Sequence, residues 1–167
     1  MSSSTLATSL PVARSSSSVG SALRALVATR DDLTPAIARV ALGVVMLPHG
    51  LQKTLGWFGG YGFTNTMKFF TETMHIPWIF GFAAILAESL GALALIAGFG
   101  TRLAALGVGA VFAVAIATVH ASHGFFMNWA GNQKGEGIEY FILGLALVAI
   151  VLIRGGGSAS VDRAISR

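Results

Sequence analysis

The chain has 167 residues, of which 54% are hydrophobic and only 11% are charged, and it carries a formal net charge of +4. Because soluble domains carry about 25% charged residues, this composition excludes an ordinary soluble domain, and we interpret the excess basic charge as membrane-flanking rather than nucleic-acid-binding. The chain contains no cysteine, which excludes thiol–disulfide exchange, iron–sulfur ligation and thiolate metal sites.

Residues 1–35 are predicted to form a disordered, Ser- and Arg-rich cytoplasmic tail. Residues 2–18 contain no apolar run that could serve as the core of a signal peptide. An organellar transit peptide is the alternative, because no acidic residue precedes Asp31. Apolar residues at helical spacing within 19–30 predict a short amphipathic helix suited to the membrane surface, with a partly ordered tail as the alternative.

Four apolar runs follow the tail. They cover residues 36–56, 77–98, 102–122 and 137–154. Each run holds about 18–22 residues, which lets a helix cross a hydrocarbon core of roughly 30 Å. Backbone groups in lipid must bond within their own segment, so these runs are helices rather than strands. The sequence therefore predicts an all-α membrane protein, a four-transmembrane-helix bundle over residues 36–154, with residues 155–167 as a C-terminal tail.

The distribution of basic residues predicts the orientation of this bundle. All eight Arg lie in the tails, in the 98–102 turn or at the adjacent span ends, and all three Lys lie on the opposite side. The positive-inside rule therefore places both the N- and C-termini in the cytoplasm. The outer connections, residues 57–76 and 123–137, are longer than turns, and the first has the apolar spacing of a lid-like surface helix.

Each predicted span contributes polar side chains to the outer half of the membrane, and we refer to them together as the polar layer. They are His49, Gln52 and Lys53 on the first span, Glu88 on the second, His120 on the third and Glu139 on the fourth. The inner half, apart from flanking arginines, is essentially apolar. An uncompensated carboxylate near the bilayer centre costs at least ~2.5–3.5 kcal/mol, so Glu88 should be paired, protonated or in a wet cavity. We expect His49 or Lys53 as its partner, and Pro48 should bend the first span and open space for a pocket.

Structural roles are the alternative for each member of the polar layer. Lys53 could extend to the headgroups, His120 and Glu139 could be hydrated interfacial residues, and Glu88 could form an ion pair that only fixes helix register. On the third span, small residues recur every fourth position. They are Ala105, Gly109, Ala113 and Ala117. This stripe predicts close helix packing that turns His120 into the bundle, and it is equally compatible with a homo-oligomer.

Three stretches carry a resemblance to a known family. They are "ARVALGVVMLPHGLQKTLG", "IPWIFGFAAILAESLGALALIAGFGTRLAAL" and "GEGIEYFILGLALVAIVL". Together they resemble the DoxX family of small bacterial membrane proteins over about residues 36–162. The resemblance implies a four-helix, multi-pass protein of the bacterial plasma membrane that acts as an oxidoreductase or with one. Relatives include the DoxD subunit of a thiosulfate:quinone oxidoreductase and a mycobacterial member that assembles with a superoxide dismutase and a sulfurtransferase-like protein.

Two functions are compatible with the sequence. The first is an accessory or quinone-interacting subunit of a membrane redox system, in which His49, Lys53 and Glu88 carry protons and the rest of the polar layer completes the quinone site. A haem held by His49 and His120 is a weaker variant, and a flavin or nicotinamide would belong to a partner, because the chain lacks a Gly-rich strand–helix unit. The second function is a non-enzymatic membrane scaffold, chaperone or adaptor that docks a partner protein. A small transporter is disfavoured, because no repeat or second broken helix is found.

Overall fold

The computed structural model describes residues 18–166, and its regular structure over that range is helical. The α-helices are α1 (Ser18–Val27), α2 (Leu33–Thr54), α3 (Gly62–Lys68), α4 (Trp78–Ala97), α5 (Thr101–Ala115), α6 (Glu139–Arg154) and α7 (Val161–Ile165). Shorter turns are the 3-10 turns η1 (Trp57–Gly59) and η4 (Ala121–His123) and the π-helical turns η2 (Phe69–Thr73) and η3 (Ile116–His120). The predicted amphipathic helix within 19–30 is present as α1, and residues 1–17 of the predicted disordered tail lie outside the described residues. The last part of that tail, residues 28–35, is ordered, because α2 already begins at Leu33.

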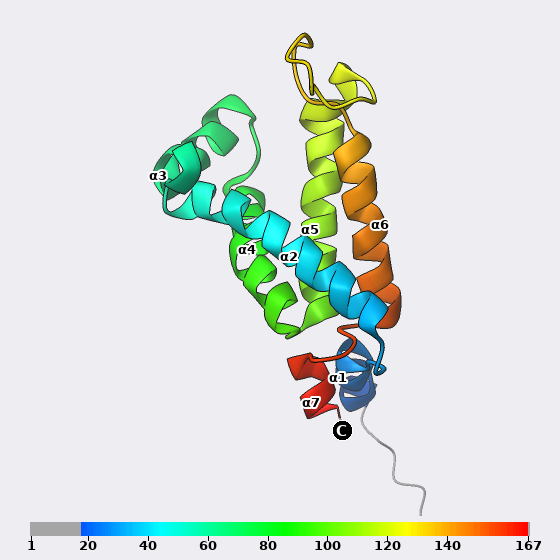
Figure 1. Cartoon of the computed structure of the whole chain (residues 1–167). Coiled ribbons are helices and arrows are strands. Elements are labelled where there is room, and N and C mark those ends of the chain that lie inside the picture. The colour runs from blue at the N-terminus through cyan, green and yellow to red at the C-terminus, as the bar shows by residue number, and fades with distance from the viewer. Residues whose placement is uncertain (1–17, 167) are drawn as a thin grey trace, which may run out of the picture.

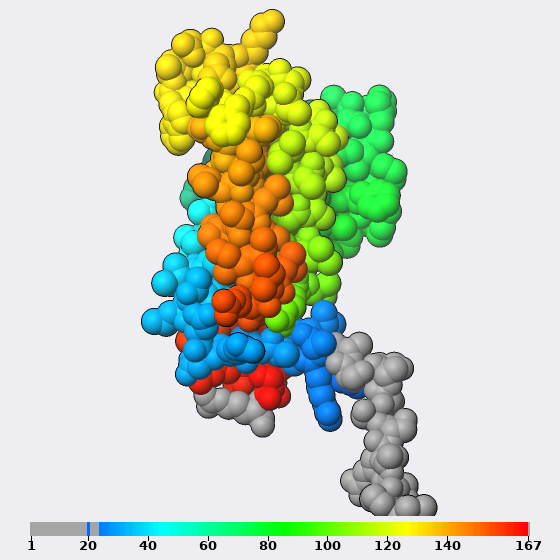
Figure 2. Space-filling model, turned by 90° about the vertical axis from the view of Figure 1, so that its right-hand side faces the viewer, coloured from blue at the N-terminus to red at the C-terminus, as the bar shows by residue number. Residues whose placement is uncertain are grey.

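The four long helices form a bundle in which α2 packs on α4, α4 on α5, α5 on α6 and α6 on α2. In Figure 1, α5 and α6 run side by side while α2 crosses them obliquely. One end of the bundle, here called the loop end, carries α3 and the connection 121–138. The other end, here called the terminal end, carries α1 and α7, and Figure 2 shows the two ends on opposite sides of α6. The predicted all-α bundle is therefore observed.

Three helices among the described residues are long and apolar enough to cross a membrane, namely Leu33–Thr54, Trp78–Ala97 and Thr101–His123. The fourth, α6, has 16 residues, and at 1.5 Å per residue it rises only ~24 Å. It is shorter than the predicted span 137–154, because the chain is still in a loop up to Ile138 and leaves the helix at Gly155. That α6 crosses the membrane stays a prediction.

The first two spans pack with their backbones almost in contact. A Cβ on Gly43 would lie 2.7 Å from the carbonyl oxygen of Ala92, and a Cβ on Gly50 would lie 2.4 Å from that of Glu88. The α2 helix continues through Pro48, whose missing N–H leaves the Val44 carbonyl without its usual partner. The two glycines thus set how α2 lies along α4, and therefore which side chains of the two helices can meet.

Replacing Gly50 with alanine is expected to lower the free energy of unfolding by about 1–3 kcal/mol, because α2 must move away from α4 to admit the Cβ. Gly91→Ala is the matched control: its Cβ would lie 3.7 Å from the nearest atom, an ordinary contact. Both substitutions gain the same helix propensity, so Gly91→Ala should be neutral or stabilise by up to about 1 kcal/mol. Unfolding in detergent micelles measures both, and equal effects would contradict the close packing at Gly50.

The small-residue stripe on α5 is only half buried. Ala105 and Gly109 are buried, whereas Ala113 and Ala117 are exposed. Residues four apart drift around a helix by about 40° per step, so a strict fourfold spacing leaves the contact face. The buried face instead continues through Phe112. The second half of the stripe therefore does not pack within the bundle.

The terminal end contains a buried polar cluster that the sequence interpretation assigned to flanking charge. The side chain of Arg39 lies inside the bundle at 2% exposure and donates to five backbone carbonyl oxygens. These are Leu95 (2.8 Å), Ile96 (2.6 Å), Gly156 (2.7 Å), Ser158 (3.2 Å) and Ala159 (2.7 Å). Asp162, 1% exposed, accepts from the N–H groups of Gly100 and Thr101 and from the Thr101 hydroxyl. Arg39, predicted to be a flanking charge, is thus a buried and fully hydrogen-bonded residue of the bundle.

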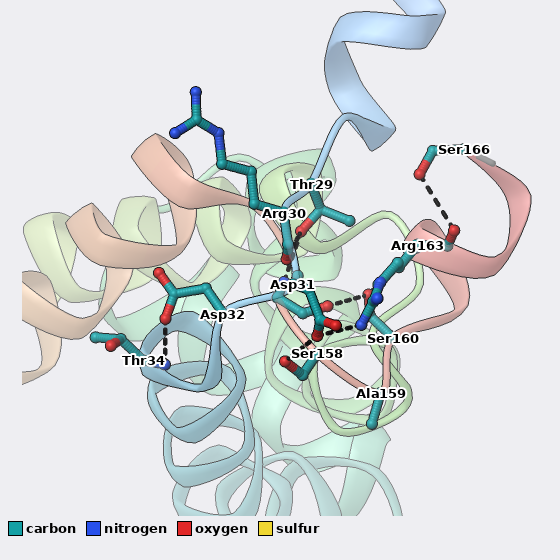
Figure 3. A network of polar contacts seen from close by, with 12 residues as sticks. Thr29, Arg30, Asp31, Asp32, Thr34, Ser158, Ala159, Ser160, Arg163 and Ser166 are labelled. Carbon is teal, nitrogen blue, oxygen red and sulfur yellow. Dashed lines mark hydrogen bonds and ion pairs between the residues drawn. The ribbon is translucent and has the colours of Figure 1, made fainter.

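The predicted tail after residue 154 packs against the start of α2 in the same cluster. Figure 3 shows Asp31 between Ser158, whose hydroxyl donates to it at 2.7 Å, and Arg163, with which it forms an ion pair. Asp32 caps α2 by accepting from the N–H of Thr34 at 2.9 Å. The C-terminal segment therefore closes the terminal end of the bundle instead of extending away from it.

Candidate functional site

The centre of the candidate site is an ion pair between Lys53, in the last turn of α2, and Glu88, in the middle of α4. The Glu88 side chain is 6% exposed and that of Lys53 is 24% exposed. The close approach at Gly50 places the two helices so that these side chains meet. Lys53 was one of the two predicted partners of Glu88, with His49, and it is the one that forms the ion pair. The ammonium thus points toward α4 and not along the helix toward the headgroups.

A first cavity of about 420 Å³ lies on one side of this pair. Its polar lining consists of His49, Lys53, Glu88, His120, Glu136 and Tyr140. Its remaining walls are apolar and aromatic, and include Phe112 and Phe141. All four long helices or their extensions contribute to it, so it lies between the helices where the polar layer was expected.

His120 reaches the first cavity from η3, the π-helical extension of α5. Its Nδ1 lies 2.8 Å from the carbonyl oxygen of Glu136, and its ring centroid lies 4.3 Å from that of Phe141. The Glu136 carboxylate accepts from the N–H of Asn128 at 2.6 Å, which ties the loop to itself. The prediction that His120 points into the bundle is confirmed, and its hydrogen bond brings Glu136 to the cavity wall.

Glu136 and Tyr140 are site residues that the sequence interpretation missed. Tyr140 directly follows Glu139, the predicted site residue, in the Gly-Ile-Glu-Tyr sequence at the start of the fourth helix. Of these two residues, Tyr140 is the one that lines the cavity. Glu136 lies in the loop, where no helical period could assign it to a face. Only the folded loop shows that it is near the ion pair.

Two members of the polar layer form hydrogen bonds with residues of the loop end and do not line the cavity. The Gln52 amide donates to the carbonyl oxygen of Phe58 at 3.3 Å. The Glu139 carboxylate accepts from the N–H of Met127 at 3.1 Å and from the indole Nε1 of Trp129 at 2.9 Å. Neither Gln52 nor Glu139 lines either cavity at the ion pair. The structure therefore brings together His49, Lys53, Glu88 and His120 at the cavity, with the Gln52 side chain beside His49 and Glu139 apart from the group.

A second cavity of about 410 Å³ lies on the other side of the ion pair. It shares four lining residues with the first, namely Lys53, Glu88, Val111 and Ala115. Apart from the ion pair and Thr118, its lining is apolar, made of small residues of α4 and α5 and of aromatic residues near η2. Lys53 and Glu88 thus form part of the wall between a polar and an apolar cavity.

The arrangement suits hydrogen bonding and proton exchange. A lysine ammonium carries three N–H donors, and Lys53 uses one of them on Glu88. The imidazoles of His49 and His120 can each donate or accept a hydrogen bond, and Tyr140 offers a further hydroxyl. Among the described residues, no group of three or more His, Cys, Asp or Glu side chains could hold a metal ion. The site thus has donors and acceptors around a small ligand, with apolar space on both sides.

The comparison with protein families gives one match. The DoxX family model matches residues 34–121, which is more than half of the chain and includes α2, α4 and α5 with four of the cavity's polar side chains. No match was found among curated proteins or among solved structures. The match agrees with the three apolar helices, because DoxX is a family of membrane proteins. The chain is therefore an integral membrane protein and belongs to the DoxX family.

Proposed function

We propose that this DoxX protein is a quinone-interacting accessory subunit of a membrane redox system. The observation that carries the proposal is the Lys53–Glu88 pair, held between a polar and an apolar cavity inside a membrane helix bundle. A quinone has this same division, with polar carbonyl oxygens on a ring and an apolar tail. The cavity volumes fall within the range of small-molecule sites.

The residues of the first cavity match the chemistry that a quinone requires. A free N–H of Lys53 can donate to one quinone carbonyl while Glu88 keeps the ammonium in place. Reduction to the quinol takes up two electrons and two protons, and His49, His120 and Glu136 line the same cavity as proton carriers. The electrons would come from a redox-active partner protein, because the chain has neither cysteine nor a nucleotide-binding Gly-rich loop.

The proposal includes an orientation in the bacterial plasma membrane. The terminal end, with its arginines, faces the cytoplasm, and the loop end, where Lys53, Lys68 and Lys134 lie, faces outward. The α6 helix is the fourth span: it lies beside α5 between the same two ends, and local bilayer thinning accommodates its shorter length. Both chain termini are then cytoplasmic.

A scaffold or adaptor role is the second candidate, and the loop end favours it. Large aromatic side chains are exposed there, among them Trp57 (56%), Phe58 (66%), Tyr61 (78%) and Trp129 (87%). Such side chains suit the membrane interface, and they also suit a docking surface for a partner protein. One protein could fill both roles, with the bundle binding quinone and the loop end docking a partner protein.

Purification from the native membrane tests the proposed function. The protein should carry a stoichiometric quinone in a mass-spectrometric analysis, and a variant with Lys53→Met and Glu88→Met should lose it. A visible spectrum recorded on the same sample tests the haem variant. A colourless, quinone-free protein that co-purifies stoichiometrically with a folded partner would contradict the redox role and support the scaffold.

A further inference from the structure

The second cavity is a groove on the outer face of α4 and α5. Its floor is made of residues without bulky side chains. They are Gly81, Ala83, Ala84, Ala87, Gly107 and Ala110. Phe69, Phe70 and Met74, from the segment between α3 and α4, cover the end of the groove nearest the loop end. Small residues on two neighbouring helices leave a furrow between them, and here they leave one that is apolar along its length.

The groove opens sideways, toward the surface that would face lipid. Ala83, Ala110 and Val114 line it and are exposed, although they lie in the middle of apolar helices. In a membrane, hydrocarbon rather than water contacts this part of α4 and α5. A molecule dissolved in the bilayer could therefore enter the groove without crossing an aqueous phase.

At its inner limit the groove meets the ion pair, and its charge is balanced there. Within the part of the chain that the structure describes, Lys53 and Glu88 are its only charged lining residues, and they neutralise each other. A phospholipid phosphate or a fatty-acid carboxylate would have to displace Glu88 to reach the ammonium. A neutral headgroup can accept a hydrogen bond from Lys53 while the pair stays intact. The groove therefore fits a long apolar chain that carries an uncharged polar head.

We infer that this groove holds the isoprenoid tail of the quinone and is the route by which the quinone enters from the bilayer. The inference rests on the proposed function, since the tail is attached to the ring that Lys53 would bind. With the ring against the Lys53–Glu88 pair, the tail must leave through the cavity that shares this pair. The ring then faces the first cavity, where His120 and Glu136 line the wall and can exchange protons with it.

The affinity that the groove adds is limited, because lipid chains are as apolar as the groove itself. Blocking the groove acts instead by steric exclusion: a ring cannot reach Lys53 when its tail has no exit. Ala110→Trp places an indole in the groove from an exposed position, so the bundle core is not disturbed. Leu106→Trp is the matched control, because Leu106 is one turn away on α5, is also exposed, and lines neither cavity.

The test measures the binding of two probes to the full chain in lipid nanodiscs, a quinone with a long isoprenoid tail and the same ring carrying only a methyl group. Ala110→Trp should weaken binding of the long-tailed probe at least about tenfold and leave the tail-less probe unchanged. Leu106→Trp should bind both probes as the wild type does. Wild-type affinity of Ala110→Trp for the long-tailed quinone would overturn the inference while the proposed function stands. Binding of neither probe to the wild type would overturn both.

A labelling experiment on the wild type gives the same answer without a substitution. A quinone that carries a photoreactive diazirine in its tail should label peptides that contain residues 81–87 and 107–119, on the two sides of the groove. Labelling confined to α6 or to the loop 124–138, with the ring still bound, would place the tail elsewhere and overturn the inference.

Discussion

Arg39→Met is expected to lower the free energy of unfolding by at least about 3 kcal/mol, the largest effect at the terminal end. Arg39 is 2% exposed and its guanidinium donates to carbonyl oxygens of two different segments. Leu95 and Ile96 belong to the last turn of α4, where carbonyls lack i+4 partners and Leu95 accepts only a 3.3 Å bond from the Gly98 N–H, and the remaining acceptors lie in residues 156–159. Methionine keeps the length of the apolar stem and removes every donor, so these buried acceptors lose their partner.

Arg154→Met is the matched control for this prediction. The Arg154 side chain is 56% exposed, and its nearest acid is Asp32 at 3.8 Å, so its loss should cost no more than about 1 kcal/mol. Removal of residues 155–167 should approach the effect of Arg39→Met, because it deletes three of the five acceptors together with Asp162. Unfolding followed by circular dichroism in mixed micelles measures all three, and an Arg39→Met protein as stable as Arg154→Met would refute the cluster.

Glu88→Met is expected to cost about 3 kcal/mol, because it leaves the Lys53 ammonium partly buried without its counter-ion. Lys53→Met should cost a similar amount through the unpaired carboxylate. The double variant, Lys53→Met with Glu88→Met, should recover much of this loss, since it replaces a buried pair with two apolar side chains of similar volume. A double-mutant cycle in detergent measures the coupling between the two positions.

Quinone binding by the same three variants distinguishes an ion pair that binds the quinone headgroup from one that only fixes helix register. If the pair binds the headgroup, the double variant should regain stability and still fail to bind quinone. If the pair only fixes helix register, the double variant should regain stability and bind as the wild type does. The second result would refute the role of Lys53 in the site, whatever the stability values are.

Local helical spacing was enough to predict part of the candidate site. His49 and Lys53 lie four residues apart on α2, and both line the first cavity, because residues at this spacing share a helix face. Glu88 could be predicted to pair because an isolated carboxylate is costly in the middle of an apolar helix. His120 was predicted to face inward, although half of the stripe used to argue it is exposed.

The remaining features depend on contacts that no helical period contains. Arg39 binds carbonyls that are 56–120 residues away in the sequence, so nearness to a span end made it resemble a flanking charge. Gln52 shares a sequence stretch with Lys53, yet its amide donates to Phe58, which the turn after α2 brings within reach. The fold of the loop gives the two glutamates different surroundings. The Glu139 carboxylate accepts a hydrogen bond from Trp129, whereas Glu136 lines the cavity.

The most direct test of the account is whether the Lys53 ammonium contacts a quinone carbonyl. The chain has only three lysines, so Lys68→Arg and Lys134→Arg leave Lys53 as the single one. Solid-state NMR of this protein, with ¹⁵N-labelled lysine and a ¹³C-carbonyl quinone in lipid, measures the dipolar coupling between the two nuclei. The account predicts a coupling of hydrogen-bonded strength, and a bound quinone with no detectable coupling to the lysine nitrogen would contradict it.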